Sequence, residues 1–271
     1  MSTKSHQASS SGIALLVINP NTTVAMTEGL RTALSPLTPP DATLTFYTAP
    51  AEYGAPHAIT DIATGVASAH ACFRDITEKK LLDQYDGFLV SCFSDHPLTH
   101  ILRAHTSKPV LNILESSISH SLLLAPRFGI LTTGTGFGYI YHQVISVSAT
   151  HPSRIARVLI ETQQDVRNFL GASSDRFAGL LTVGVGPAEL DGTGSIPKAE
   201  VDKRLRESAL KMKGELGADV IILGCAGMAG MEPLVRNAVT DAGLGQVRVV
   251  DGAKAGVQFL AGLARLDKAS R

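Results

Sequence analysis

Short apolar runs and longer amphipathic stretches alternate along almost the whole chain. The apolar runs are nearly continuous, as is typical of strands that a sheet buries on both faces. The stretches between them repeat their apolar residues at helical spacing. Strand and helix in alternation predict βαβ units and therefore parallel sheets. The predicted strands are residues 12–18, 42–47, 87–91, 110–113, 128–132, 178–183, 220–223 and 247–250, and the predicted helices are residues 23–34, 59–82, 98–104, 153–169, 198–215, 231–242 and 253–266.

A weak internal repeat relates the two halves of the chain. The first half opens with LLVINPNTT and the second with FGILTTGTG, each an apolar strand that runs into a polar turn. The first half later contains YDGFLVSCFSD, and the second contains ADVIILGCAGM. In both, an apolar strand and a small residue precede a cysteine, Cys92 in one copy and Cys225 in the other. Both cysteines therefore follow the carboxyl end of a predicted parallel strand, where open α/β sheets bind ligands.

The repeat predicts an α/β fold of two similar Rossmann-like lobes with parallel sheets, related by a pseudo-twofold axis. Such an axis brings the carboxyl edges of the sheets face to face, so the two cysteines are expected to face each other across one active-site cleft. We expect lobe 1 to contain residues 12–118 and 250–271, and lobe 2 to contain residues 119–249. Residues 1–11 are polar and rich in serine, and we interpret them as a disordered tail.

The composition argues against several classes of function. The 24 basic residues balance the 24 acidic residues and form no basic stripe, so no nucleic-acid partner is expected. No apolar run approaches the roughly 20 residues that a membrane helix needs, and the first 11 residues lack the apolar core of a signal peptide. Three cysteines are too few, and odd in number, for a disulfide scaffold. The reducing cytoplasm is therefore the expected location.

The two repeated cysteines are the candidate catalytic residues. We expect a helix to begin at His96 with Asp95 as its N-cap, and a turn of small residues to lead from Cys225 into another helix. A thiol at a helix N-terminus meets unpaired N–H groups and the positive end of the helix dipole, which favour the thiolate and can hold an oxyanion. A cysteine is more often a small packing residue, as we interpret Cys72 in mid-helix. The matched positions of Cys92 and Cys225 favour acid/base chemistry instead.

Other motifs do not define a cofactor or metal site. His96 and His100 share a helix face, but the HExxH glutamate and a third ligand are lacking, so solvated or capping histidines are the better interpretation. His96 is still close enough in sequence to tune the pKa of Cys92. The GTGFG at residues 134–138 lacks the spacing of a dinucleotide fingerprint, and we interpret it as a turn. Walker A and GxSxG patterns are absent, which disfavours phosphoryl transfer and serine-triad hydrolysis.

Polar turns follow the first strand of each half. Asn19 lies in the first of these turns, and Thr132 and Thr133 lie in the second. Turn formation and helix capping are sufficient explanations for such residues. A compatible alternative is that both turns line the cleft beside the thiols.

Five ordered motifs resemble the Asp/Glu/hydantoin racemase superfamily. They are VINPNTT at the start, CFSD at 92–95, ILESS at 113–117, FGILTT at 128–133 and GCAGM at 224–228. The segment YGAPHAIT at 53–60 is similar to a loop of the hydantoin and allantoin racemase branch, which has fungal members. The resemblance covers nearly the whole chain after the tail. It is specific for the superfamily and less so for the substrate.

The resemblance implies a cofactor-independent racemase, an isomerase of nitrogen metabolism that acts on a small cyclic amide such as a 5-substituted hydantoin or allantoin. One thiolate removes the proton beside a carbonyl, and the second thiol reprotonates the planar intermediate from the other face. Cys92 and Cys225 map onto the two family cysteines. The implied substrate cradle is Asn19, Thr132 and Thr133 with the backbone at Phe93, Ser94, Ala226 and Gly227, and the supporting residues are Asp95, His96 and Glu115. Neither metal nor cofactor is expected, and base rates favour a homo-oligomer.

One departure and several alternatives concern the substrate. Bacterial hydantoin racemases usually continue CFSD with Pro-Gly, whereas this chain has His96 and Pro97, which puts pocket shape and substrate choice in question. An amino-acid racemase, an arylmalonate-type decarboxylase and a maleate-type isomerase belong to the same superfamily, and a non-catalytic metabolite-binding protein has the same architecture. The decarboxylase uses a single cysteine. A dicarboxylate would also require cations near the cleft, and Arg103 and Arg127 lie outside the motif turns.

Overall fold

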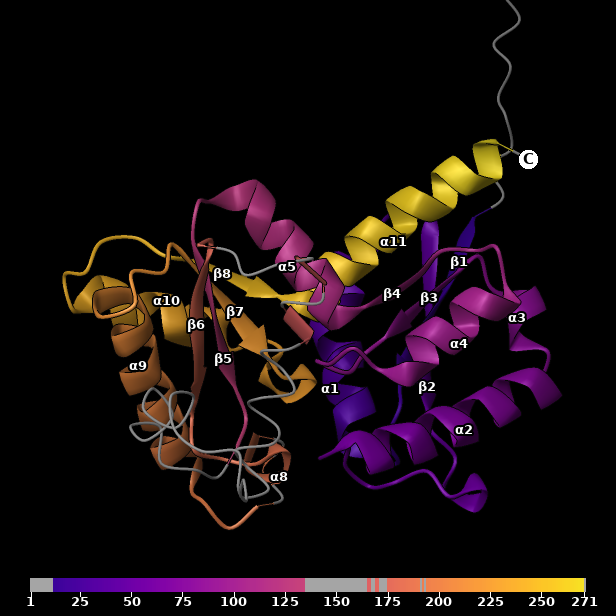
Figure 1. The fold of residues 1–271 in the computed structure, drawn as a ribbon, viewed down its shortest axis with the longest axis horizontal. Coiled ribbons are helices and arrows are strands. Elements are labelled where there is room, and N and C mark those ends of the chain that lie inside the picture. The colour runs from indigo at the N-terminus through magenta and orange to yellow at the C-terminus, as the bar shows by residue number, and fades with distance from the viewer. Residues whose placement is uncertain are drawn as a thin grey trace, which may run out of the picture.

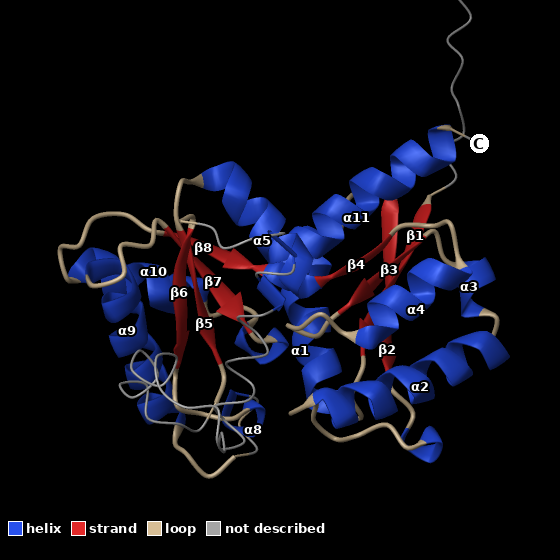
Figure 2. Cartoon of the chain, in the orientation of Figure 1, coloured by secondary structure: helices blue, strands red, loops and turns tan. Residues whose placement is uncertain are grey.

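The computed structural model describes residues 12–134, 165–166, 169–170, 175–190, 192 and 194–270. Within these residues, two four-stranded parallel sheets form the centres of two lobes (Figures 1 and 2). The strand order is β2 (Ala42–Thr48), β1 (Ile13–Asn19), β3 (Gly87–Val90) and β4 (Val110–Asn112) in the first sheet, and β6 (Phe177–Thr182), β5 (Phe128–Thr132), β7 (Val220–Gly224) and β8 (Arg248–Asp251) in the second.

The two sheets repeat one topology. In each, the first strand of the lobe lies between its second and third strands, and the fourth strand closes one edge. The central pairs end together, with Ile18 opposite Val90 in the first sheet and Thr132 opposite Gly224 in the second. The α/β fold class of two similar parallel-sheet lobes is therefore confirmed.

Helices cover both faces of these sheets (Figure 2). The described helices are α1 (Val24–Leu34), α2 (Ile62–Glu78), α3 (Leu81–Gln84), α4 (Pro97–His105), α5 (Ile113–Leu124), α8 (Pro187–Leu190), α9 (Lys198–Gly214), α10 (Glu232–Asp241) and α11 (Gly252–Ala269), with short 3-10 turns η1 (Ser35–Leu37), η2 (Ala51–Tyr53) and η3 (Ala226–Met228). No helix of the described residues is both long and apolar enough to span a membrane.

Two helices, α5 and α11, connect the two lobes. Leu114 and Ile118 of α5 pack into the core of the second sheet. The last helix, α11, returns to the first sheet, where Val257 and Leu260 join its core. The two helices pack against each other at the centre of the molecule (Figure 1). The expected boundary at residue 118 lies inside α5, and the division into residue ranges stays a proposal.

The start of α4 differs from the expectation. Asp95 is not the N-cap: that position belongs to His96, whose Nδ1 accepts a hydrogen bond from the backbone N–H of Leu98 at 3.2 Å. Pro97 is the first helical residue. An imidazole nitrogen can replace the usual carboxylate or hydroxyl oxygen because the cap needs only an acceptor two residues before the N–H. The side chain of Asp95 instead bonds His100.

One other predicted helix differs from the structure, and a second lies almost wholly outside the described residues. The helix expected at 59–82 begins only at Ile62, and a left-handed residue, Lys80, separates its end from α3. No helix was expected over α5. The helix predicted at 153–169 and the tail at 1–11 lie almost wholly outside the described residues.

Candidate active site

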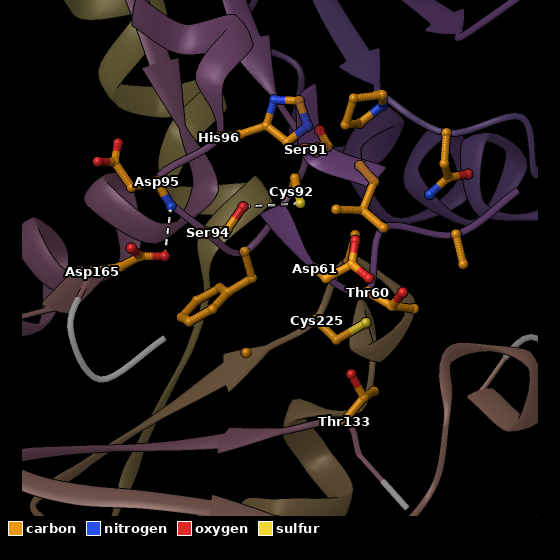
Figure 3. A pocket seen from close by; sticks show the side chains of 18 of the residues that line it. Thr60, Asp61, Ser91, Cys92, Ser94, Asp95, His96, Thr133, Asp165 and Cys225 are labelled. Carbon is orange, nitrogen blue, oxygen red and sulfur yellow. Dashed lines mark hydrogen bonds between the residues drawn. The ribbon is translucent and has the colours of Figure 1, made fainter. Parts of the chain in front are cut away.

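A cavity of about 390 Å³ lies at the carboxyl ends of the central strands, with lining residues from both lobes. The lining comes mainly from residues 20–21, 58–62, 91–97, 132–133 and 224–226, together with Met26, Gly65 and Asp165. Both repeated cysteines are in this lining. Figure 3 shows their side chains pointing into the cavity, Cys92 from the first lobe and Cys225 from the end of β7. The expected juxtaposition at the sheet edges is thus present.

Cys92 lies two residues after the end of β3, in the wall of the cavity. Its Sγ lies 3.2 Å from Oγ of Ser94. Burial raises the pKa of the Cys92 thiol to about 12, and the Ser94 hydrogen bond opposes that shift. The expectation that a helix N-terminus favours this thiolate is therefore wrong. The helix α4 begins at Pro97 with His96 as its N-cap, so Cys92 is neither the cap nor a residue of its first turn.

Cys225 directly follows β7 and is the N-cap residue of η3. Its backbone is extended, so the chain leaves the sheet before it turns. A negative charge on Cys225 raises the pKa of Cys92. Because like charges interact appreciably only at short range in protein, this coupling places the two thiols in one electrostatic environment. Such a pair carries one negative charge far more readily than two.

Hydroxyl groups occupy the cavity wall around the thiols. Thr132 is buried and donates from Oγ1 to the backbone oxygen of Gly224 at 2.8 Å, which fixes the end of β7 just before Cys225. Thr133 lines the cavity itself, as does Ser94 (Figure 3). Phe93 and Ala226 are also lining residues.

Three residues of the expected site are not in the cavity lining. Asn19 is buried, and its amide nitrogen donates to the Thr23 backbone and the Thr27 hydroxyl, so it builds the turn beneath the cavity. Gly227 lies behind Cys225; a Cβ built there would lie 3.7 Å from the sulfur. Glu115 is on α5, where its carboxylate pairs with both terminal nitrogens of Arg103.

The supporting residues Asp95 and His96 both line the cavity. His96 is 1% exposed, and burial lowers the pKa of its imidazole to about 4. It is therefore neutral at pH 7. The nearby carboxylate of Asp95 acts in the opposite direction on the His96 pKa, but burial dominates.

Sequence reasoning missed two acidic residues of the cavity. Asp165 accepts a hydrogen bond from the backbone N–H of Asp95 at 2.9 Å, which connects the two lobes across the cavity rim (Figure 3). Burial raises the pKa of the Asp165 carboxyl. Asp61 is the N-cap of α2 and accepts from the N–H of Thr64. The only signal for Asp61 was its position directly after the YGAPHAIT segment.

The charged groups of the lining share one sign. Asp61, Asp95 and Asp165 are acidic, and no lysine or arginine is among the described lining residues. Arg103 lies away from this cavity on Glu115. A carboxylate ligand would therefore meet acidic groups without a guanidinium or ammonium partner.

Comparison with known proteins gives a consistent assignment. Residues 15–151 and 159–260 match the family described as Asp/Glu/Hydantoin racemase. An uncharacterized protein of Schizosaccharomyces pombe is 37% identical over 94% of this chain and 93% of its own length. A hydantoin racemase of Pseudomonas sp. is 29% identical over 93% of this chain and 86% of its own length. The crystal structure of an allantoin racemase from Pseudomonas fluorescens superposes with a TM-score of 0.73 at 22% identity, covering 94% of this chain and 92% of that one, which shows the same fold.

Proposed function

Because the chain belongs to the Asp/Glu/hydantoin racemase family, we propose that it racemises an uncharged cyclic amide of the 5-substituted hydantoin or allantoin type through Cys92 and Cys225. Membership of a racemase family confirms the expected enzyme class, an isomerase. The observation that carries the proposal is the pair of thiols, which corresponding strands of two repeated sheets bring to one cavity. The similarity to a hydantoin racemase and to the fold of an allantoin racemase supports the substrate class.

The proposed reaction moves one proton off a carbon and another onto it. In one direction the Cys225 thiolate takes the proton from the carbon beside the carbonyl, and the electron pair of the C–H bond moves onto the carbonyl oxygen. The Cys92 thiol then donates its proton to the opposite face of the planar carbon, and the carbonyl re-forms. The opposite enantiomer reacts with the two roles exchanged. The scheme involves no net oxidation and uses no cofactor.

The electrostatics of the cavity suit this scheme. Burial keeps Cys92 protonated, as a proton donor must be before the reaction. The coupling between the thiols favours one thiolate opposite one thiol, which is the state that each direction requires. Hydroxyl groups of Ser94 and Thr133 and the backbone beside each cysteine are the groups that would hold the carbonyl oxygens.

An uncharged substrate fits the lining better than a dicarboxylate. Three aspartates line the cavity, and the described lining has no cationic side chain to pair with a carboxylate. Transfer of an unpaired carboxylate to such surroundings is strongly unfavourable. A hydantoin ring presents only neutral carbonyl and N–H groups. This favours the cyclic amide over malonate or maleate derivatives.

Loss of optical activity tests the proposal. Enantiopure 5-substituted hydantoins, both enantiomers of allantoin and free amino acids are incubated with the protein at neutral pH, without added cofactor, and followed by circular dichroism, and an arylmalonate is incubated in parallel and followed by carbon dioxide release. We expect enzyme-dependent convergence of both hydantoin enantiomers to the racemate. Racemisation of amino acids alone would show that the substrate is an amino acid and not a cyclic amide. Carbon dioxide release from an arylmalonate would show that the reaction is a decarboxylation and not a racemisation. Absence of all these activities would contradict the proposal.

A further inference from the structure

An apolar groove of about 860 Å³ lies between α5, α11 and the edge strand β4. None of the described residues lines both this groove and the cavity of the two thiols. On the α11 side of the groove, Leu263 is 42% exposed and Leu266 is 70% exposed. Phe169 also lines the groove and is 39% exposed. Large apolar side chains that gather in one exposed groove indicate an interaction surface.

The helix α11 carries apolar residues on two of its faces. Its inner face packs on the first sheet through residues such as Val257 and Leu260. Phe259, Leu263 and Leu266 are spaced i, i+4 and i+7, so they share a second face, which lines the groove. A surface helix normally has one apolar stripe and polar residues opposite it. Figure 1 shows α11 along the outside of the molecule, and its second stripe stays uncovered in the part of the chain that the structure describes.

The aromatic residue of this stripe is held in a defined position. The ring of Phe259 meets the ring of His120 edge-on, with the ring centroids 5.9 Å apart. An aromatic side chain that is already fixed loses little conformational freedom when a partner binds. Phe259 is therefore suited to be the anchor of a contact, with the exposed leucines beside it.

The edge strand beside the groove is partly covered by a side chain of the same chain. Arg103 donates from Nε and Nη2 to the backbone oxygen of Val110, at 3.1 and 2.8 Å. The same guanidinium also pairs with the carboxylate of Glu115. A partner that adds a strand to β4 would compete with these bonds. This favours a partner that packs by its side chains, as a helix does.

The charges around the groove are balanced within the chain. Each of the three basic residues of α11 pairs with an acidic residue. These pairs are Lys254 with Glu232, Arg265 with Asp41, and Lys268 with Asp86. A helix that binds an anionic membrane has a basic polar face instead. A second copy of this chain presents the same neutral face, so the two copies meet without an excess of like charge.

We propose that this groove is the interface of a homodimer, in which the α11 helices of two copies pack antiparallel about a twofold axis near Leu263. Such an axis places Phe259 of each copy against Leu266 of the other. The 18 residues of α11 span about 27 Å. A contact along that length, with the flanking face of α5, is large enough for the roughly 800 Å² per partner of a standard stable interface. The interface lies apart from the thiols, so it does not depend on the proposed function.

Sedimentation velocity of the full chain over a range of concentrations tests the interface. We expect wild type to have about twice the chain mass of 28.5 kDa. The variants are Leu263→Glu and Leu266→Glu, which place a charge in the apolar contact at positions that are exposed in the single chain. The matched control is Leu123→Glu, because Leu123 is 78% exposed on α5 and does not line the groove. Circular dichroism checks that all four proteins are folded.

The measured quantity is the dissociation constant of the dimer. Each groove variant should raise it by roughly 30-fold or more, the effect of losing a central contact residue. Leu123→Glu should leave it unchanged. A wild-type protein that stays monomeric up to about 100 µM would overturn the homodimer and leave the groove to a different partner. A dissociation constant that the groove variants do not change, or that Leu123→Glu raises equally, would also overturn it.

Cross-linking tests the position of the twofold axis. Leu263→Cys is incubated with oxidised glutathione, and the products are separated on a denaturing gel and identified by mass spectrometry. Two residues that face each other on a twofold axis between packed helices are close enough for a disulfide. We expect a covalent dimer joined at position 263, and none in Leu123→Cys. A dimer that forms in solution without this cross-link would overturn the antiparallel arrangement.

Discussion

Cys92 and Cys225 enter one cavity from corresponding strands of two repeated sheets. The first follows β3 and the second follows β7, and each of these strands is third in its lobe and lies between the first and fourth. Charge on one thiol raises the pKa of the other. The repeat thus supplies two similar groups on opposite sides of one space, which is what proton transfer to both faces of a carbon requires.

Substitution of either cysteine is expected to abolish racemisation. Cys92→Ser and Cys225→Ser should each lower kcat/KM by at least about 10²-fold to 10⁴-fold, the range for loss of a positioned acid or base. The rate of circular-dichroism loss measures this effect. Cys72→Ala is the matched control, because Cys72 is buried within α2 and does not line the cavity. It should keep its activity and lose about 1 kcal/mol of unfolding free energy. Full activity in Cys225→Ser would contradict the two-thiol scheme.

The pH profile should lack an alkaline fall in the accessible range. Activity requires one thiolate and one thiol, so kcat/KM rises as the first thiol ionises and falls only when the second does. Because the pKa of Cys92 is about 12, the second ionisation lies far above neutrality. We expect kcat/KM to rise and then stay level up to about pH 10. Both enantiomers must follow one profile, since the equilibrium constant of racemisation is one. A bell-shaped profile that falls at pH 8 to 9 would contradict this assignment.

Acid should destabilise the protein in part through His96. Burial lowers its pKa from 6.5 to about 4, so the folded state binds the proton less well than the unfolded state. The resulting stabilisation is fully present above pH 6.5 and is lost as the pH falls toward 4. From pH 7.5 to 4.5 the loss should be about 2–3 kcal/mol.

Chemical denaturation of wild type and His96→Asn at the two pH values measures this contribution. The variant should lose less unfolding free energy than wild type over the same interval. The carboxyls of Asp165 and Asp251 have raised pKa values and act in the opposite direction, but they are present in both proteins and cancel in the comparison. Equal losses in the two proteins would show that His96 does not titrate in this way.

The junction between the lobes should tolerate no side chain at the first residue of α11. A Cβ at Gly252 would overlap the backbone oxygen of Ile113, the first residue of α5. Backbone cannot move as a flexible side chain can, so Gly252→Ala should cost about 1–3 kcal/mol or more of unfolding free energy. Gly262→Ala in the same helix has open space around its Cβ and should gain up to about 1 kcal/mol from helix propensity. Thermal or denaturant unfolding of the two variants measures these changes in unfolding free energy. Equal changes in both variants would contradict the close contact between the starts of α11 and α5.

The positions of the strands along the chain could be predicted from the sequence, because a strand that is buried on both faces has a nearly continuous apolar run. The expected run 220–223 corresponds to β7 at Val220–Gly224, and the run 12–18 corresponds to β1 at Ile13–Asn19. The repeated cysteine motif then located the sheet edge. The family resemblance supplied the cyclic-amide substrate class, which periodicity alone does not contain.

The helix α5 could not be recognised from its amphipathic pattern. It lies between the second sheet and α11, so little of its surface needs to be polar. Its buried serines satisfy their hydroxyls on its own backbone: Ser116 bonds the oxygen of Asn112, and Ser121 bonds that of Ser117. Asp165 could not be recognised either, because its place in the cavity depends on a contact with Asp95, seventy residues away in the sequence. Neither arrangement has a local sequence signal.

Solvent deuterium tests the two-thiol account most directly. Each enantiomer of a reactive hydantoin is incubated in heavy water at neutral pH, with an enzyme-free control for spontaneous exchange, and the hydrogen at the reacting carbon is followed by NMR in both enantiomers at low conversion. Because one thiol removes the proton and the other supplies a solvent-derived one, the product enantiomer should carry deuterium from the start, while the remaining substrate keeps its protium. Product that retains the substrate's protium, or deuterium at equal levels in both enantiomers, would contradict the account.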